Sequence, residues 1–281
     1  LGDFEHFMLK EIYEQPDTLR TCMKGRIDAA GSKIVLGGLA DHSDELAKIQ
    51  RVLLLGQGTA LHAAMIGEYL FEGLAGVPTE VEFASEFRYR NPIVEDRTVA
   101  IAVSQSGETA DTLAAVQEAK RRGAITLGAV NVVGSSIARE TDAGVYLRVG
   151  PEIGVASTKA FIGQVAVLTM LAAYIGRRHH LGRDEMSDLM YAFEEIPDHI
   201  ETILAQSEHI HKFRNGDSPI FRPSIRLFLN GCMRSGVSLS LSLRTFFATI
   251  ILCACVCVCF CFILLLSRSS LFIPVTRYGI L

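Results

Sequence analysis

The chain has 281 residues, of which 49% are hydrophobic and 21% are charged, with a mean hydropathy of +0.29. These values lie near the average of globular proteins, so they argue against a disordered chain, a collagen-like repeat and a polytopic membrane protein. The length allows one or two domains with a substantial hydrophobic core.

Charge and cysteine are distributed unevenly along the chain. All 31 acidic side chains but only 23 of the 27 basic ones precede Leu227, which gives that part a net charge of −8. An anionic body is not expected to bind nucleic acid. Cys22 is the one cysteine of this part, so we expect a reduced, cytoplasmic protein. The other six are Cys232, Cys253, Cys255, Cys257, Cys259 and Cys261.

The N-terminal residues 1–30 are expected to form a helical arm. No basic flank followed by an apolar run occurs near Leu1, so we expect no signal peptide. The chain does not begin with Met, from which we expect a fragment or a processed product.

From residue 31 to residue 206, short apolar runs alternate with helical patterns, which predicts one domain. The predicted strands are residues 51–56, 77–84, 98–107, 124–130 and 144–150. The predicted helices are residues 59–76, 106–123, 157–176 and 184–206. Because parallel strands need crossover helices, this alternation predicts an α/β fold, a doubly wound parallel sheet of about five strands flanked by helices. Ligands of such sheets bind beyond the carboxyl ends of the strands.

Residues 207–281 form an atypical, hydrophobic tail of low complexity. Residues 246–266 carry no charge and are long enough to span a bilayer, which leaves a membrane anchor as one interpretation. Residues 238–243 read SLSLSL and residues 253–261 read CACVCVCFC. Repeats of TC and TG in DNA translate to these dipeptides, so we favour spurious translation of non-coding sequence, and membrane binding is not expected. The alternating cysteines lack the spaced pairs or histidines of a zinc site.

The segment Ser104 to Thr109 is the strongest candidate site. It lies where a buried strand is predicted to turn into a helix, with Ser106 as N-cap and Gly107 allowing close approach of a ligand. Hydroxyls and the positive end of a helix dipole favour a phosphate-type anion. In the simpler alternative, Ser106 only caps its helix. Glu108 would repel a bound dianion, so we expect its side chain to face away.

Two further turns are predicted at the same end of the sheet. Gly56-Gln57-Gly58-Thr59 resembles the start of a dinucleotide fingerprint, but Leu61 occupies the third glycine position, so nucleotide binding is not favoured. We expect this turn to bring Thr59 to the cleft. Before the long helix, Ser157 or Thr158 is expected as the N-cap residue. A role of this turn in substrate binding is an equally favoured alternative to capping alone.

No metal or cofactor site is expected. His179, His180, His209 and His211 lie in polar surroundings and are expected to be solvated. Cys22 has no cysteine or histidine near it in sequence, so it is not expected to be a nucleophile.

Four motifs together resemble one family. They are EIYEQP (11–16), ASEFRYR (84–90), SQSGETADTL (104–113) and GVASTKAF (154–161). In this order they are similar to the isomerase half of glucosamine-6-phosphate synthase, the glutamine:fructose-6-phosphate aminotransferase, which is built from SIS domains. The resemblance covers about residues 3–206 and implies the first SIS domain of that half.

The resemblance implies binding of fructose 6-phosphate or glucosamine 6-phosphate. The residues implied to bind the phosphate are Ser104, Gln105, Ser106 and Thr109. Thr59 is implied to contact the substrate, and Val155 and Ser157 to line the sugar. Ala60 stands where the family usually has Ser, which removes one hydroxyl.

The family's catalytic Lys and Glu, its ring-opening His and its C-terminal Lys have no match in this chain. The resemblance therefore implies a fragment that binds the substrate but is inactive alone. The family forms homodimers, and the resemblance does not decide whether this fragment does. A non-catalytic, sugar-phosphate-binding SIS regulator is the alternative. A nicotinamide-dependent oxidoreductase is a third interpretation, and it would need a small residue at Leu61.

Overall fold

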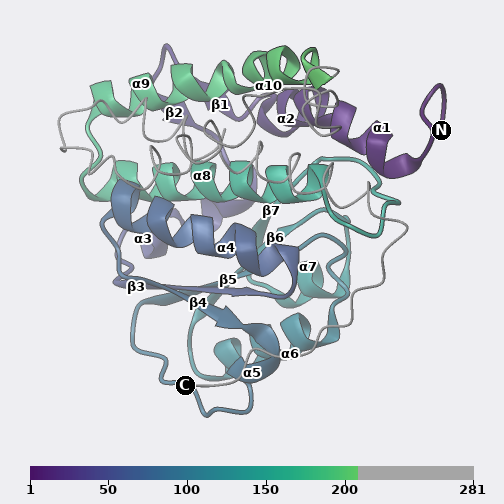
Figure 1. The fold of residues 1–281 in the computed structure, drawn as a ribbon. Coiled ribbons are helices and arrows are strands. Elements are labelled where there is room, and N and C mark those ends of the chain that lie inside the picture. The colour runs from purple at the N-terminus through teal and green to yellow at the C-terminus, as the bar shows by residue number, and fades with distance from the viewer. Residues whose placement is uncertain (208–281) are drawn as a thin grey trace, which may run out of the picture.

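A computed structural model describes residues 1–207 of the chain (Figure 1). Its main sheet consists of β3 (Arg51–Gly56), β4 (Thr79–Phe83), β5 (Thr98–Ser104), β6 (Ile125–Val130) and β7 (Ala143–Tyr146). The helices around the sheet are α3 (Ser43–Leu46), α4 (Thr59–Leu70), α5 (Ala84–Phe87), α6 (Ala110–Arg121), α7 (Ser136–Glu140) and α8 (Lys159–His179). The remaining helices and strands are α1 (Phe7–Tyr13), α2 (Gln15–Met23), β1 (Ile27–Asp28), β2 (Lys33–Ile34), α9 (Arg183–Glu194) and α10 (Ile196–Leu204), together with the short 3₁₀ helix η1 (Gly37–His42) and the π-helical turn η2 (Phe71–Ala75).

The five main strands are all parallel and lie in the order β4-β3-β5-β6-β7. The predicted α/β class and the five-stranded, doubly wound sheet are confirmed. The connection from β3 leads outward to β4, whereas the chain from β5 continues toward β6 and β7 on the other side. The strand order thus reverses between β3 and β5, and sheets of this kind bind their ligands at such a point.

Side chains of the central strands alternate between the larger core on one face of the sheet and two smaller cores on the other. Val52 and Leu54 of β3 belong to the larger core, which includes α4 and α8, while Leu53 and Leu55 belong to a second core with α5 and α6. A parallel sheet buried on both faces has no polar side to alternate with. This is why β3 is an uninterrupted apolar run in the sequence.

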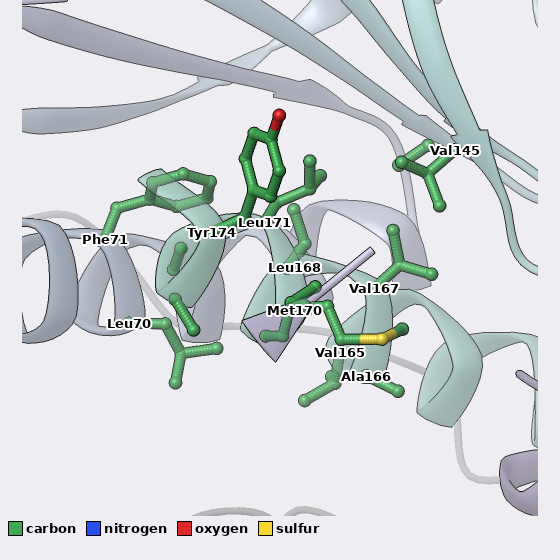
Figure 2. Packing of buried hydrophobic residues seen from close by; sticks show 14 of the residues in the cluster. Leu70, Phe71, Val145, Val165, Ala166, Val167, Leu168, Met170, Leu171 and Tyr174 are labelled. Atoms are coloured by element: carbon green, nitrogen blue, oxygen red, sulfur yellow. The ribbon is translucent and has the colours of Figure 1, made fainter. Parts of the chain in front are cut away.

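Helix α8 is the centre of the larger core. Every residue from Lys159 to Gly176 is buried, and Leu168, Leu171 and Tyr174 pack beside the α4 end at Leu70 and Phe71 (Figure 2). The helix is long and apolar enough to cross a bilayer, but its apolar window lies wholly inside the fold. It is a core helix, packed between the sheet and an outer layer, as its sequence predicts.

The outer layer contains α1, α2, α9 and α10 (Figure 1). Arg20 of α2 donates hydrogen bonds to Asp198 and Glu201 of α10, each at 2.6 Å, and so joins the N-terminal arm to the last described helix. The proposed division at residues 30 and 206 stays a prediction. Residues 246–266, for which a membrane anchor was one interpretation and spurious translation the favoured one, lie outside the described residues.

Several predicted element boundaries are wrong, and two of them have a clear local cause. The helix expected over residues 184–206 is two helices, because Pro197 lies in the first turn of α10, where a missing N–H costs nothing. The fifth strand ends at Tyr146 rather than at residue 150. Arg148 has a φ of 58°, which takes the backbone out of the extended conformation.

We expect a protein of residues 1–207 to fold cooperatively, because the larger core extends from Leu19 to Ile200. Thermal unfolding of this shortened chain, followed by circular dichroism, should show one transition with a native near-ultraviolet spectrum. A gradual loss of signal without a transition would show instead that residues 208–281 are needed for the fold.

Candidate functional site

A cleft opens where the order of the strands reverses, at the carboxyl ends of β3 and β5. Its volume is about 190 Å³. The residues that line it are Gln57, Thr59, Ala60, Val103, Ser104, Gln105, Ser106, Thr109, Thr112 and Gln164. None of these side chains is charged, and the cleft contains five of the seven predicted site residues.

The turn after β5 forms one wall of the cleft. The Ser104 Oγ atom accepts a hydrogen bond from the Gly107 N–H at 3.0 Å and lies 3.5 Å from the Thr109 Oγ1 atom. The Ser106 Oγ atom accepts a hydrogen bond from the Glu108 N–H at 3.2 Å. Each hydroxyl that fixes the turn can still donate its proton, so the turn presents donors to a ligand.

The predicted N-cap of the following helix is wrong. Helix α6 begins at Ala110, with Thr109 as the N-cap residue, and no side chain caps its N–H groups. Ser106 lies three residues before that position, inside the turn. The first-turn N–H groups of α6 therefore lack a side-chain acceptor, as at a helix end that can bind an anion.

Gly107 is required for the shape of this turn. Its φ is +68°, and a Cβ atom at this position would lie 2.0 Å from the Ser135 Oγ atom. Any other residue would therefore suffer both backbone strain and a collision. The glycine holds Ser104 and Thr109 close together at the cleft.

Glu108 faces away from the cleft, as expected. Its Oε1 atom accepts a hydrogen bond from the Ser136 N–H at 2.8 Å, at the start of α7. Hydrogen bonds from Ser136 hold the pKa of this carboxyl below its ordinary value. The carboxylate is thus kept charged at a second helix N-terminus, where it does not repel an anion in the cleft.

The turn after β3 supplies the opposite wall. Gly58 has a φ of 56°, and α4 begins immediately after it at Thr59. Gln57, Thr59 and Ala60 all line the cleft. The tight turn expected from the sequence therefore places Thr59 at the same cleft as Ser104.

Val155 and Ser157 are not among the residues that line the cleft. The Val155 side chain is fully exposed. Ser157 donates a hydrogen bond from Oγ to Glu152 Oε2 at 3.1 Å. The structure thus brings together the residues of two predicted turns and leaves those of the third beside the start of α8.

Glu152 caps α8. Its Oε1 atom accepts hydrogen bonds from the N–H groups of Thr158, at 2.8 Å, and Ala160, at 3.2 Å. Thr158 is the N-cap residue, as the sequence predicts, but its own side chain makes no capping hydrogen bond. Sequence reasoning missed Glu152 because the acceptor lies six residues before Thr158, outside the usual capping pattern.

The N-terminal arm holds the loop before α8. The Glu11 Oε1 atom accepts hydrogen bonds from the N–H groups of Ile153, at 2.6 Å, and Gly154, at 3.1 Å. The Lys159 ammonium donates to the Glu14 carboxylate at 2.8 Å, and this hydrogen bond lowers the pKa of Glu14. Two of the four sequence motifs, 143 residues apart at Glu11 and Gly154, are therefore in direct contact.

The other candidate groups that the structure describes make no reactive centre. Burial raises the pKa of the Cys22 thiol to about 11, so it is protonated and unreactive at neutral pH. His179 and His180 are exposed, whereas His209 and His211 lie outside the described residues. Within residues 1–207, no group of three or more His, Cys, Asp or Glu side chains is placed to hold a metal ion.

Comparison with known proteins identifies the domain around the cleft. The model of the SIS domain family matches residues 45–174. Glutamine–fructose-6-phosphate aminotransferase (isomerizing) of Chlorobaculum tepidum is 50% identical over 209 residues, which are 74% of this chain and 34% of the relative. The enzyme of the same name from Bacteroides thetaiotaomicron is 47% identical over 210 residues, again 74% and 34%.

A solved structure agrees with these relatives. The C-terminal domain of glucosamine-fructose-6-phosphate aminotransferase from Francisella tularensis superposes with a TM-score of 0.72 at 32% identity, covering 76% of this chain and 59% of that one. The chain spans about a third of the length of the curated relatives it matches. The resemblance to the isomerase half, inferred from four motifs, is confirmed.

We expect Glu11→Ala to destabilise the protein by about 1–3 kcal/mol, because it leaves two N–H groups of the loop without an acceptor. For a domain of this size, the melting temperature should fall by roughly 2–4 °C for each kcal/mol. Glu5→Ala is the matched control, since Glu5 is an exposed glutamate of the same arm. Equal melting temperatures for the two variants would contradict a supporting role of Glu11.

Proposed function

Because residues 45–174 are a SIS domain, we propose that this chain binds a hexose 6-phosphate, fructose 6-phosphate or glucosamine 6-phosphate, in the cleft between β3 and β5. One observation carries the proposal: Thr59, Ser104, Gln105, Ser106 and Thr109 converge on a single cleft, although they come from two separate turns. The names of the matched relatives specify fructose 6-phosphate as their substrate.

Phosphate recognition in this cleft depends on neutral donors. The lining residues include hydroxyls and amides but no Lys or Arg. The positive end of α6, a helix of 12 residues, adds a favourable potential for a dianion. Hydrogen bonds to charged oxygens are stronger than neutral ones, so three or four of them suffice without an ion pair.

We propose that the sugar extends from the phosphate turn toward the start of α8. Gln164 lines the cleft five residues after Lys159, the first residue of α8, which is roughly 7–8 Å along the helix axis. Val155 and Ser157 precede that start by a few residues. They are therefore proposed to contact the distal part of the sugar rather than the phosphate.

The cleft contains binding groups without an acid or base. Its lining includes no Asp, Glu, His, Lys or Cys, and Glu152 is engaged with the start of α8. Moving a proton between two sugar carbons needs such a group within hydrogen-bond reach. We therefore propose that this chain contributes the substrate site of an isomerising aminotransferase and does not turn substrate over by itself.

The alternative function, a non-catalytic regulator that binds sugar phosphates, would use the same cleft. The identity to aminotransferases at 50% and 47% extends over about 210 residues, well beyond the phosphate turn. The motifs at residues 11–16 and 84–90 lie within the resemblance and outside the cleft. A shared phosphate turn alone would not require them, so we favour the aminotransferase.

We expect Ser106→Ala combined with Thr109→Val to weaken binding of fructose 6-phosphate about a hundredfold or more, measured by calorimetry. Each lost hydrogen bond to a charged oxygen contributes about 1.5–3 kcal/mol. Ser85→Ala combined with Thr202→Val makes the same two chemical changes outside the cleft and should leave the affinity unchanged. Equal affinities for the two double variants would refute the phosphate site.

We expect the purified 281-residue chain to form no glucosamine 6-phosphate from fructose 6-phosphate and excess ammonium. Binding the phosphate holds ground state and transition state about equally, which does not accelerate the chemical step. General acid–base groups contribute about 10²–10⁴ each to the rate, and the cleft lining has none. Turnover above background that Ser104→Ala abolishes would show that this expectation is wrong.

A further inference from the structure

Gln164 is a buried polar residue on a helix that is otherwise largely apolar. Its side chain is 1% exposed, and it lines the cleft from the α8 side. The Oε1 atom has no hydrogen-bond partner. The other buried side-chain atoms without a partner in residues 1–207 are the hydroxyls of Thr98 and Ser135, and neither residue lines the cleft.

An unpartnered amide oxygen in such a place is costly. Leaving a buried acceptor without a donor forfeits the hydration it had in the unfolded chain, and most buried polar groups in proteins are paired for this reason. A leucine of similar size would pack at this position without that cost. Gln164 thus lowers the stability of the ligand-free protein, as is common for a residue that contacts a ligand.

The chemistry of the Gln164 Oε1 atom limits the groups that can bond to it. A carboxamide oxygen only accepts hydrogen bonds, and the oxygens of a phosphate dianion do the same, so the two cannot bond to each other. The phosphate donors, Ser104, Ser106 and Thr109, belong to the turn after β5, whereas Gln164 belongs to α8. A donor for its Oε1 atom must therefore come from the uncharged part of the ligand.

We propose that the Gln164 carboxamide accepts a hydrogen bond from a hydroxyl of the bound hexose and so determines preference for a sugar phosphate over phosphate alone. This inference rests on the proposed function, since it concerns the same cleft. It assigns a second task to α8, which the sequence marks only as a core helix. Ala60, which also lines the cleft, offers no hydroxyl that could take over this contact.

The decisive variant is Gln164→Leu, which removes the amide and keeps a similar volume. We expect it to weaken fructose 6-phosphate binding about tenfold by calorimetry, while the affinity for inorganic phosphate changes less than about twofold. We also expect the ligand-free variant to melt at a higher temperature, by roughly 2–4 °C, because the unpaired oxygen is gone. A residue with a purely structural role would lower the melting temperature instead.

Thr169→Val is the matched control. Thr169 is equally buried on α8 and donates its hydroxyl to the Val165 carbonyl at 2.8 Å, away from the cleft. This variant should bind fructose 6-phosphate as the unchanged chain does. Its melting temperature should not rise, since a satisfied hydrogen bond is lost.

The outcomes separate the two proposals. If the unchanged chain binds no hexose phosphate at all, the proposed function fails. If it binds fructose 6-phosphate and Gln164→Leu binds equally well, the function stands and the role of Gln164 is refuted. If Gln164→Leu weakens phosphate and fructose 6-phosphate equally, the amide nitrogen donates to the phosphate, and the proposed hydroxyl contact is overturned.

Discussion

The candidate site depends on the reversal of the strand order between β3 and β5. Because these parallel neighbours send their connections in opposite directions, neither of the two connections crosses above the gap between their carboxyl ends. Helices α4 and α6 begin there on opposite faces of the sheet, each after a glycine in the left-handed conformation. Strand order thus creates the cleft, and the two turns decide which polar groups enter it.

The sheet and the cores on its two faces follow from sequence periodicity, but the element boundaries do not. The apolar run of residues 52–56 can be placed from the sequence because a buried parallel strand excludes polar residues on both faces. The break before Pro197 and the end of β7 near Arg148 depend on single residues within longer patterns. Of the site, the two turns were predictable, since hydroxyls and glycines there follow strand ends.

Three side-chain roles were not predictable from the sequence. Glu152 reaches forward over six residues to cap α8, and Glu11 reaches a loop more than a hundred residues away. Gln164 looks like one polar residue in a core helix until the fold places it at the cleft. In each case the side chain gains its role from tertiary position, which composition and spacing do not encode.

The N-terminal arm also supports the domain that the family model matches. The family match begins at residue 45, yet Glu11 and Glu14 lie before it and contact Ile153, Gly154 and Lys159. Buried backbone N–H groups need acceptors, and the loop before α8 obtains two of them from the arm. The loop that carries Val155 and Ser157 therefore takes its shape from residues outside the SIS domain. The resemblance extends to residue 11 because the arm and this loop are one structural unit: without Glu11 the N–H groups of Ile153 and Gly154 would lose their side-chain acceptor.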